Sequence, residues 1–294
     1  MRLPQRLPTI RPLRFRTCVG VALITGMMLM ACVQAPHTPN PPPPWTDLEK
    51  ARLEALMPAD VLLLGEQHDA PEHQELERRV IEWLAEQGKL AAVAMEMAPK
   101  GSDTRGLPRQ ASVPEVQAAL GWDDAGWPWE AYGPVVMAAV RAGIPVLGAN
   151  LPRSEQRSSM RDTSLDSRLP PAVVETQTQR IRDGHCGLLP ESQMQSMTRI
   201  QIARDISMAE TIVGALQPGR TVLLVAGNGH VERGLGVPAH LPTPINAKVI
   251  SARAGEQAAS TPSAVADAIW ATPPVTPKDY CAEMKRAARG KANM

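Results

Sequence analysis

The sequence predicts an α/β protein whose mainly parallel central sheet is flanked by helices. Five short runs are apolar throughout instead of alternating, which is typical of strands buried on both faces of a parallel sheet. Segments with helical spacing of apolar residues lie between these runs. Such alternation of strand and helix is the pattern of α/β folds. A chain of 294 residues is also long enough to bury a sizeable core.

The expected strands are residues 61–65, 91–96, 145–149, 221–226 and 247–251. The expected helices are residues 47–57, 72–87, 130–142 and 191–216. In the second helix Leu76, Val80 and Leu84 fall on one face, which indicates a helix packed against the sheet. Gly143 ends the third helix, and Pro190 precedes the fourth.

We expect a single domain over residues 46–252, because no repeat or linker divides this range. Residues 253–294 are expected to form a C-terminal tail, tied back to the domain by a disulfide. The apolar core must be built mainly from aliphatic residues, since aromatic residues make up only 3% of the chain.

The N-terminus predicts a lipoprotein signal peptide over residues 1–31. It has five arginines, no acidic residue and an apolar run that is too short to span a membrane. The run ends in Leu29-Met30-Ala31-Cys32, which resembles the bacterial lipobox, in which the cysteine becomes the lipidated first residue. An ordinary secretory signal is the alternative. Acyl chains on Cys32 would anchor the mature protein to membrane lipid.

Residues 32–45 read as the lipidated cysteine and a stiff, proline-rich stalk. Val33 rather than Asp follows the cysteine, which resembles the sorting pattern of Gram-negative outer-membrane lipoproteins. We therefore expect the mature protein at the periplasmic face of the outer membrane.

Loss of residues 1–31 removes five arginines and leaves 26 basic and 30 acidic residues. No basic patch remains, so nucleic acid is not an expected partner. The same cleavage leaves Cys186 and Cys281 as the pair available for a disulfide in an oxidising compartment. Two unpaired buried thiols are the alternative.

Polar residues follow the ends of the expected strands. The first strand leads into Gly65-Glu66-Gln67-His68-Asp69, and the second ends on Glu96. The third is followed by Arg153, and the fourth by Gly227-Asn228-Gly229-His230. Sites in parallel α/β sheets lie at the carboxyl ends of the strands, so these side chains should share one rim. Each glycine would allow an abrupt turn, including one with positive φ.

Imidazole and carboxylate groups together suit a divalent transition metal, and Glu66, His68, Glu96 and His230 are the candidate ligands. The alternative for each histidine is a structural hydrogen bond. We expect Asp69 to cap the helix that begins near Pro71, and His73 to lie at the solvated start of that helix.

Several stretches resemble the ChaN family of haem-binding lipoproteins, within the Tiki/TraB and erythromycin-esterase-like superfamily. They include "LLLGEQHDAPEHQ", "AMEM", "WPWEAYGPVV", "IPVLGANLPR", "HCGLLPESQMQSMTRIQIARDISMAE" and "VLLVAGNGHVERGLGVPAHL", spread over residues 61–241. The resemblance implies a related sheet fold and haem or iron binding at the cell envelope, in iron acquisition. In the Tiki branch the same motifs imply metal-dependent hydrolysis of peptides.

Carried over by position, Glu66, His68, Glu96 and His230 fall on the superfamily's active-site pattern and would be catalytic in a hydrolase. Arg153 is a weaker match. The ChaN branch's use of a tyrosine for haem points to Tyr132, with His185 as a second candidate.

Trp122, Trp127, Trp129 and Met137 could line an apolar slot for haem. The branch also makes a homodimer plausible. Two functions therefore compete: an envelope lipoprotein that binds haem or iron, and a metal-dependent peptidase or esterase. A degenerate rim that only organises the loops is a third reading.

Overall fold

The structure, a computed structural model, describes residues 45–255 and 264–292. The expected signal peptide, the lipidation site Cys32 and nearly all of the stalk lie outside the described residues. The chain divides into two units, residues 1–45 and 46–294. The second unit contains every element discussed below. Among the described residues, no helix is both long and apolar enough to cross a membrane.

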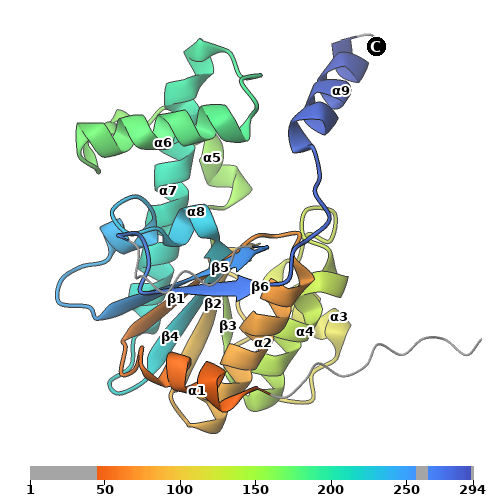
Figure 1. The fold of residues 1–294 in the computed structure, drawn as a ribbon, viewed down its shortest axis with the longest axis vertical. Helices are drawn as coiled ribbons and strands as arrows, with labels where there is room; N and C mark the ends of the chain where they lie inside the picture. Colours follow the sequence, from red (N-terminus) through yellow and green to blue (C-terminus); the bar gives the residue numbers. More distant parts are fainter. Residues whose placement is uncertain (1–44, 256–263, 293–294) are drawn as a thin grey trace, which may run out of the picture. The chain divides into compact units, whose positions relative to one another are not determined.

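A six-stranded sheet forms the centre of the fold, and all of its strand pairs are parallel. The strand order is β3-β2-β4-β1-β5-β6 (Figure 1). The strands are β1 (Val61–Glu66), β2 (Leu90–Pro99), β3 (Val146–Asn150), β4 (Thr221–Gly227), β5 (Ala247–Ala254) and β6 (Ala268–Thr272). This confirms the predicted fold class.

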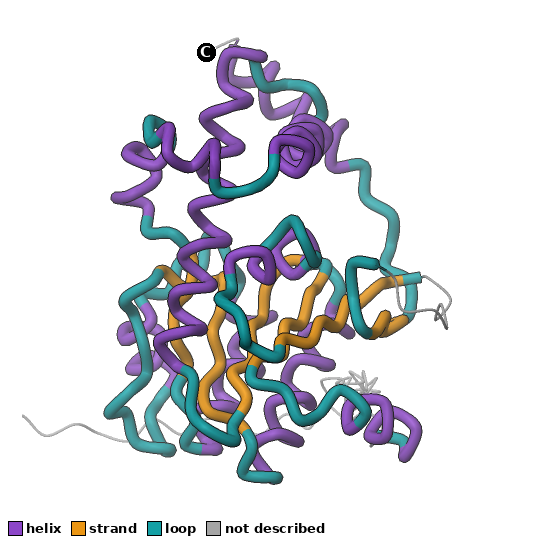
Figure 2. The backbone as a smooth tube through the Cα atoms, turned by 90° about the vertical axis from the view of Figure 1, so that its left-hand side faces the viewer, coloured by secondary structure: helices purple, strands orange, loops and turns teal. Residues whose placement is uncertain are grey.

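Helices cover both faces of the sheet (Figures 1 and 2). On one face, α2 (Pro71–Glu86) packs against α4 (Trp129–Ala142), and α7 (Glu191–Ala215) lies against β2, β3 and β4 on the other. The remaining helices are α1 (Asp47–Glu54), α3 (Val113–Leu120), α5 (Arg153–Ser159), α6 (Pro171–Gly184), α8 (Asn228–Val231) and α9 (Tyr280–Ala292). Short 3-10 turns at Thr163–Ser167 and Val237–His240 complete the described elements.

The core is aliphatic, as the composition predicts. Every residue of β1 and of β4 is buried, and their side chains pack against Met208 and Ile212 of α7. Burial of both sheet faces explains why these strands are apolar throughout the sequence. A polar residue can then appear only where a strand leaves the core, which is where the site lies.

The C-terminal region differs most from the sequence-based prediction. The sheet continues past residue 252, because β6 pairs in parallel with β5 from Ile250↔Ala268 to Ala254↔Thr272. The single-domain boundary at residue 252 is therefore too early. Beyond β6, α9 is tied to the loop before α7 by the predicted Cys186–Cys281 disulfide.

The first helix also differs from expectation, since α1 ends at Glu54 rather than at residue 57. Thr46 and Glu49 form a capping box at its start, in which each side chain bonds the other residue's backbone.

Candidate functional site

The two Gly-x-x-His motifs lie side by side at the carboxyl end of the sheet. Strands β1 and β4 are neighbours, and Glu66 of β1 is paired in register with Gly227 of β4. His68 follows β1 by two residues, and His230 lies in the short helix α8 after β4. Glu96 reaches the same point from β2, the other neighbour of β4.

Five side chains form a continuous row that we call the Glu–His chain: Glu66, His68, Glu96, His230 and Asp205. His68 Nδ1 lies 2.8 Å from Glu66 Oε1, and His68 Nε2 lies 4.0 Å from Glu96 Oε2. The other Glu96 oxygen lies 3.3 Å from His230 Nε2. His230 Nδ1 in turn lies 2.5 Å from Asp205 Oδ1. Carboxylates and imidazoles therefore alternate along the whole row.

His230 is held as a cation between two buried carboxylates. Burial lowers the pKa of His230, but the charges of Glu96 and Asp205 outweigh it and raise that pKa to about 10. Burial raises the pKa of Asp205 to about 6, against the opposing effect of His230. Burial also acts to raise the pKa of Glu96, yet the positive charge of His230 brings it well below its usual range.

His68 differs from His230 because its side chain is 40% exposed. Burial lowers the pKa of His68, but the hydrogen bond to Glu66 and the charge of Glu96 have the larger combined effect and raise it. His68 is thus the member of the row that meets solvent while its Nδ1 is fixed by a carboxylate. Trp127 packs edge-on against the His68 ring at a centroid distance of 4.8 Å.

Glu66 is a buried acceptor for three side chains. The Tyr132 hydroxyl donates to Glu66 Oε1 at 2.8 Å, and Gln74 of α2 donates to Oε2. Burial and the Glu66 charge raise the pKa of Tyr132 far above its usual value, so the phenol keeps its proton. Tyr132 is buried in the core, and its hydroxyl is used in the bond to Glu66.

The glycines of the two motifs are needed for close packing. A Cβ on Gly227 would lie 2.9 Å from His68 Nε2, and one on Gly65 would lie 2.4 Å from Val231 Cγ2. Neither glycine has a positive φ, so the expected left-handed turn is not the reason for either. Gly227 leaves room for His68 and Glu96 beside β4, and Gly65 leaves room for α8 beside β1.

A further buried carboxyl group, that of Glu77, lies next to Glu66 of the Glu–His chain. Glu77 of α2 is fully buried, and neither of its oxygens has a hydrogen-bond partner among the described residues. Burial, followed by the charge of Glu66, raises the pKa of Glu77 well above its usual value. Burial beside the Glu–His chain therefore favours the protonated form of Glu77.

A cavity of about 530 Å³ opens beside His68. Its described lining residues are His68, Asp69, Pro71, Gln74, Glu75, Pro128, Glu130, Ala131, Pro134 and Lys278. The walls come from the start of α2, the start of α4 and the segment before α9. Of the Glu–His chain, His68 is the member that reaches this cavity.

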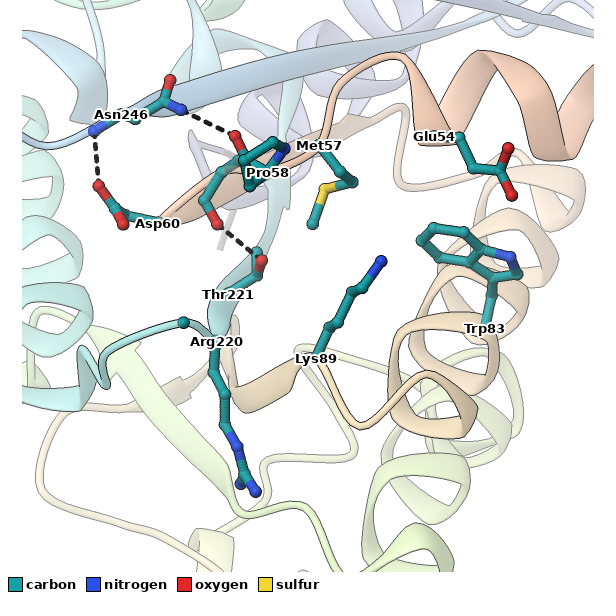
Figure 3. Close-up of a pocket in the computed structure, with 11 residues that line it drawn as sticks. Glu54, Met57, Pro58, Asp60, Trp83, Lys89, Arg220, Thr221 and Asn246 are labelled. Atoms are coloured by element: carbon teal, nitrogen blue, oxygen red, sulfur yellow. Dashed lines mark hydrogen bonds between the residues drawn. The ribbon is translucent and has the colours of Figure 1, made fainter.

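A second recess, of about 450 Å³, lies at the opposite end of the sheet, where β1 and β4 begin (Figure 3). Its polar groups bond one another: Asn246 donates to Asp60 and to the Pro58 carbonyl, and Thr221 donates to the Ala59 carbonyl. Lys89 lies over the Trp83 ring. These contacts are structural, and the recess contains no counterpart of the Glu–His chain.

Two residues near the first motif have other roles than expected. Asp69 does not cap α2, whose N-cap is Ala70 without a side-chain hydrogen bond. Instead Asp69 accepts from Gln67 and from Tyr280. His73 is buried and not solvated, and its ring bonds the Gln67 backbone N–H and the Thr272 hydroxyl.

Two expected haem-binding residues lie away from the cavity lining. Arg153 is 84% exposed and pairs with Asp123 at 2.5 Å. His185 follows the end of α6, where its Nδ1 lies 2.8 Å from the Ile181 carbonyl. Of the expected aromatic slot, Trp122 and Trp127 pack around Tyr132, and Trp129 packs against Trp122.

The predicted divalent-metal site has no support from the geometry. Over residues 45–255 and 264–292, no group of three or more His, Cys, Asp or Glu side chains is arranged to hold a metal ion. The physical reason is that the imidazole nitrogens and carboxylate oxygens already bond one another. A metal would have to displace contacts such as that between His230 and Asp205.

Sequence reasoning missed three residues of the site: Asp205, Gln74 and Glu77. Each lies on a helix and reaches the row from the side, so no strand end marks it. A signal existed for Glu77, because it falls on the buried face of α2 that also carries Val80, Ile81 and Leu84. A carboxyl group on the apolar face of a helix requires a partner or a raised pKa.

Comparison with known proteins gives a family and a structural relative. The family described as "Haem-binding uptake, Tiki superfamily, ChaN" matches residues 52–241. A solved structure described as cofacial haem binding to ChaN of Campylobacter jejuni is 26% identical. The match covers 76% of this chain and 91% of the ChaN chain, with a TM-score of 0.61.

Two further solved structures are more distant. The type III effector HopBA1 is 14% identical over 74% of this chain and 88% of its own, with a TM-score of 0.36. A Bacillus cereus protein is 12% identical over 71% of this chain and 70% of its own, with a TM-score of 0.37. Among curated proteins, no sequence matches this chain.

The family match spans both Gly-x-x-His motifs, Glu96, Tyr132 and Asp205, which are the residues that build the site. It also explains why the ChaN relative shares the fold over most of both chains. This chain belongs to the ChaN family of haem-binding uptake proteins in the Tiki superfamily.

Proposed function

We propose that this protein is an outer-membrane lipoprotein that binds haem in the cavity beside His68 and serves iron acquisition. Family membership and the ChaN relative, whose description names cofacial haem binding, support a haem ligand. The lipobox-like sequence ending in Cys32 supports a lipid anchor on the periplasmic face.

The residues of the cavity suit haem. Its volume of about 530 Å³ lies within the range of roughly 300–1,000 Å³ that is usual for cofactor pockets. Pro71, Pro128, Ala131 and Pro134 give apolar walls for a flat macrocycle. Haem iron is bound in proteins by side chains that include His and Tyr, and His68 lies in this wall.

The half-exposed ring of His68, with its Nδ1 held by Glu66, is the observation that carries this proposal. When one ring nitrogen of a histidine binds a metal, a carboxylate bonded to the other nitrogen orients the ring and makes it more basic. Tyr132, the candidate that the family suggests, donates its hydroxyl proton to Glu66 and is buried. We therefore assign the iron ligand to His68 and keep Tyr132 as the alternative.

Titration of the purified protein with haemin tests the assignment. We expect a saturable Soret band that shifts and weakens in His68→Ala but persists in Tyr132→Phe. Arg153→Ala is the matched control, because Arg153 pairs with Asp123 on the surface. Loss of binding in Tyr132→Phe alone would make Tyr132 the ligand. No saturable spectrum in the wild-type protein would refute haem binding.

The cofacial arrangement named for the ChaN relative supports a haem-dependent homodimer in this protein as well. We expect the mass measured by analytical ultracentrifugation to double when haem is added. An unchanged monomer at saturating haem would contradict the dimer while leaving haem binding in place.

Hydrolysis is the second candidate function, and the pairing of His68 with Glu66 favours it. A half-exposed imidazole held by a carboxylate can act as a general base on water. Turnover of ester or peptide substrates that is lost in both His68→Ala and Glu96→Gln would support this function.

A further inference from the structure

The chain after β6 is fixed at both of its ends. We call residues 273–279 the C-terminal strap; it joins β6 to α9 without regular secondary structure. At one end, the Thr272 hydroxyl lies 2.9 Å from Nε2 of the buried His73. At the other end, Cys281 in the first turn of α9 is bonded to Cys186 in the loop before α7.

Lys278 of the strap and Tyr280, the first residue of α9, both contact Asp69, which follows His68 in the sequence. The Tyr280 hydroxyl donates to Asp69 Oδ2, and Lys278 Nζ lies 3.7 Å from the same oxygen. Asp69 Oδ1 accepts from Gln67 at 2.9 Å, so this carboxylate joins the strap to the loop after β1. Most of the strap is otherwise exposed, so these contacts determine where it lies.

Lys278 faces the cavity beside His68. It lies in the cavity wall with a side chain that is 51% exposed. None of the other described lining residues is a lysine or an arginine. The other charged groups in that wall are Asp69, Glu75 and Glu130, and Glu75 is paired with Arg78 outside the lining. The strap lies beyond residues 52–241, the part of the chain that the family matches.

We propose that the C-terminal strap is part of the ligand site: it closes one side of the cavity and presents Lys278 to an acidic substituent of the bound molecule. The Cys186–Cys281 disulfide and Asp69 hold the strap in this position. The inference rests on the proposed haem function, since it assigns Lys278 to the carboxylates of that ligand. Haem carries two propionate carboxylates, and an ammonium group at the cavity edge can pair with one of them.

Substitution of Lys278 tests the charge recognition. We expect Lys278→Met to weaken binding of haemin by about fivefold, as for a partly exposed ion pair. Binding of haemin dimethyl ester, which lacks both carboxylates, should be unchanged by the same substitution. Lys285→Met is the matched control, because Lys285 is exposed on α9 outside the cavity lining. Equal affinities of wild type and Lys278→Met for haemin would overturn the role of Lys278.

Removal of the disulfide tests the strap itself, and this experiment has a readout that needs no haem. In the ligand-free Cys186→Ser/Cys281→Ser protein, we expect amide hydrogens of residues 67–75 to exchange at least tenfold faster than in the wild-type protein. Tyr280→Phe should give part of this effect with the disulfide intact. The rate at which bound haemin dissociates should also rise, slightly in Tyr280→Phe and more in Cys186→Ser/Cys281→Ser.

The two proposals can fail separately. Unchanged hydrogen exchange at residues 67–75 in the double variant would overturn the strap, whatever the haem result. If exchange rises but the wild-type protein binds no haem, the strap closes the cavity and the haem function is wrong. If haem binds and both exchange and dissociation are unchanged, the haem function stands and the strap proposal fails.

Discussion

His230 Nδ1 lies 2.5 Å from Asp205 Oδ1, and both side chains are buried. A histidine fixed in this way keeps its proton through the neutral range, since its pKa is raised to about 10. His68 has a similar partner at Nδ1, Glu66, but its side chain is 40% exposed and meets the cavity. The buried end of the Glu–His chain therefore stabilises the fold, and the exposed end is free to meet a ligand.

Protonated His230 should make the free energy of unfolding depend on pH. The folded pKa lies above the ordinary value of 6.5, so its stabilising contribution is complete below about pH 6.5. It is lost as the pH rises toward about 10. We expect His230→Gln to lower the free energy of unfolding at pH 6 by about 3–5 kcal/mol, because it leaves two buried carboxylates without a cation.

Denaturant unfolding of both proteins between pH 6 and pH 10.5 measures this effect. The difference between wild type and His230→Gln should shrink as the pH rises. A difference that stays constant over this range would show that His230 is neutral in the folded protein.

Substitution of Gly227 should disturb the row directly. A Cβ at this position would lie 2.9 Å from His68 Nε2 and 3.6 Å from Glu96 Oε2. We expect Gly227→Ala to lower the free energy of unfolding by about 1–3 kcal/mol through overpacking. Gly229→Ala is the control, because a Cβ there meets nothing within 4 Å. Similar stabilities of the two variants, measured by guanidinium unfolding, would refute the close approach.

Glu77 should cost stability at neutral and alkaline pH. Burial and the Glu66 charge raise its pKa, so the folded protein holds a proton that the unfolded chain releases above about pH 4.5. We expect Glu77→Leu to raise the free energy of unfolding by about 1–2 kcal/mol at pH 8, and by less at pH 5. Glu86→Leu on the exposed part of α2 should give no such pH-dependent gain. A loss of stability in Glu77→Leu at both pH values would mean that the carboxyl has a structural partner.

The disulfide should stabilise the whole described C-terminal region. It joins residues that are 95 positions apart, and the chain-entropy model gives about 4–5 kcal/mol for a loop of this length. We expect Cys186→Ser/Cys281→Ser to lower the free energy of unfolding by up to that amount. The wild-type protein under reducing conditions should match the variant. A change below about 0.5 kcal/mol in thermal or denaturant unfolding would contradict this expectation.

The strands and the rim could be predicted from the sequence because both follow from burial. Strands such as Val61–Glu66 are apolar on both faces, and a residue like Glu66 can occur only where the strand leaves the core. The glycines of both motifs also marked the rim, although their physical role is close packing and not positive φ.

The rest depends on contacts that sequence periodicity does not contain. Asp205 lies in the middle of a 25-residue helix, and nothing local distinguishes it from a solvated aspartate. Tyr132 meets Glu66 across 66 residues, and Tyr280 meets Asp69 across 211. β6 was missed because five residues with only one fully buried side chain give a weak pattern.

The strand order has a consequence for how the site is assembled. β1 and β2 follow one another in the chain, yet β4 lies between them, so Glu96 first meets Gly227 when a segment 131 residues further on is in place. Contacts over such separations form slowly, because the chain entropy of closing the loop is lost before they are made. A chain that ends before residue 221 lacks β4, so β1 and β2 would have no strand between them and Glu96 would not meet Gly227 or His230. The Glu–His chain can therefore form only after β4 has been inserted between β1 and β2.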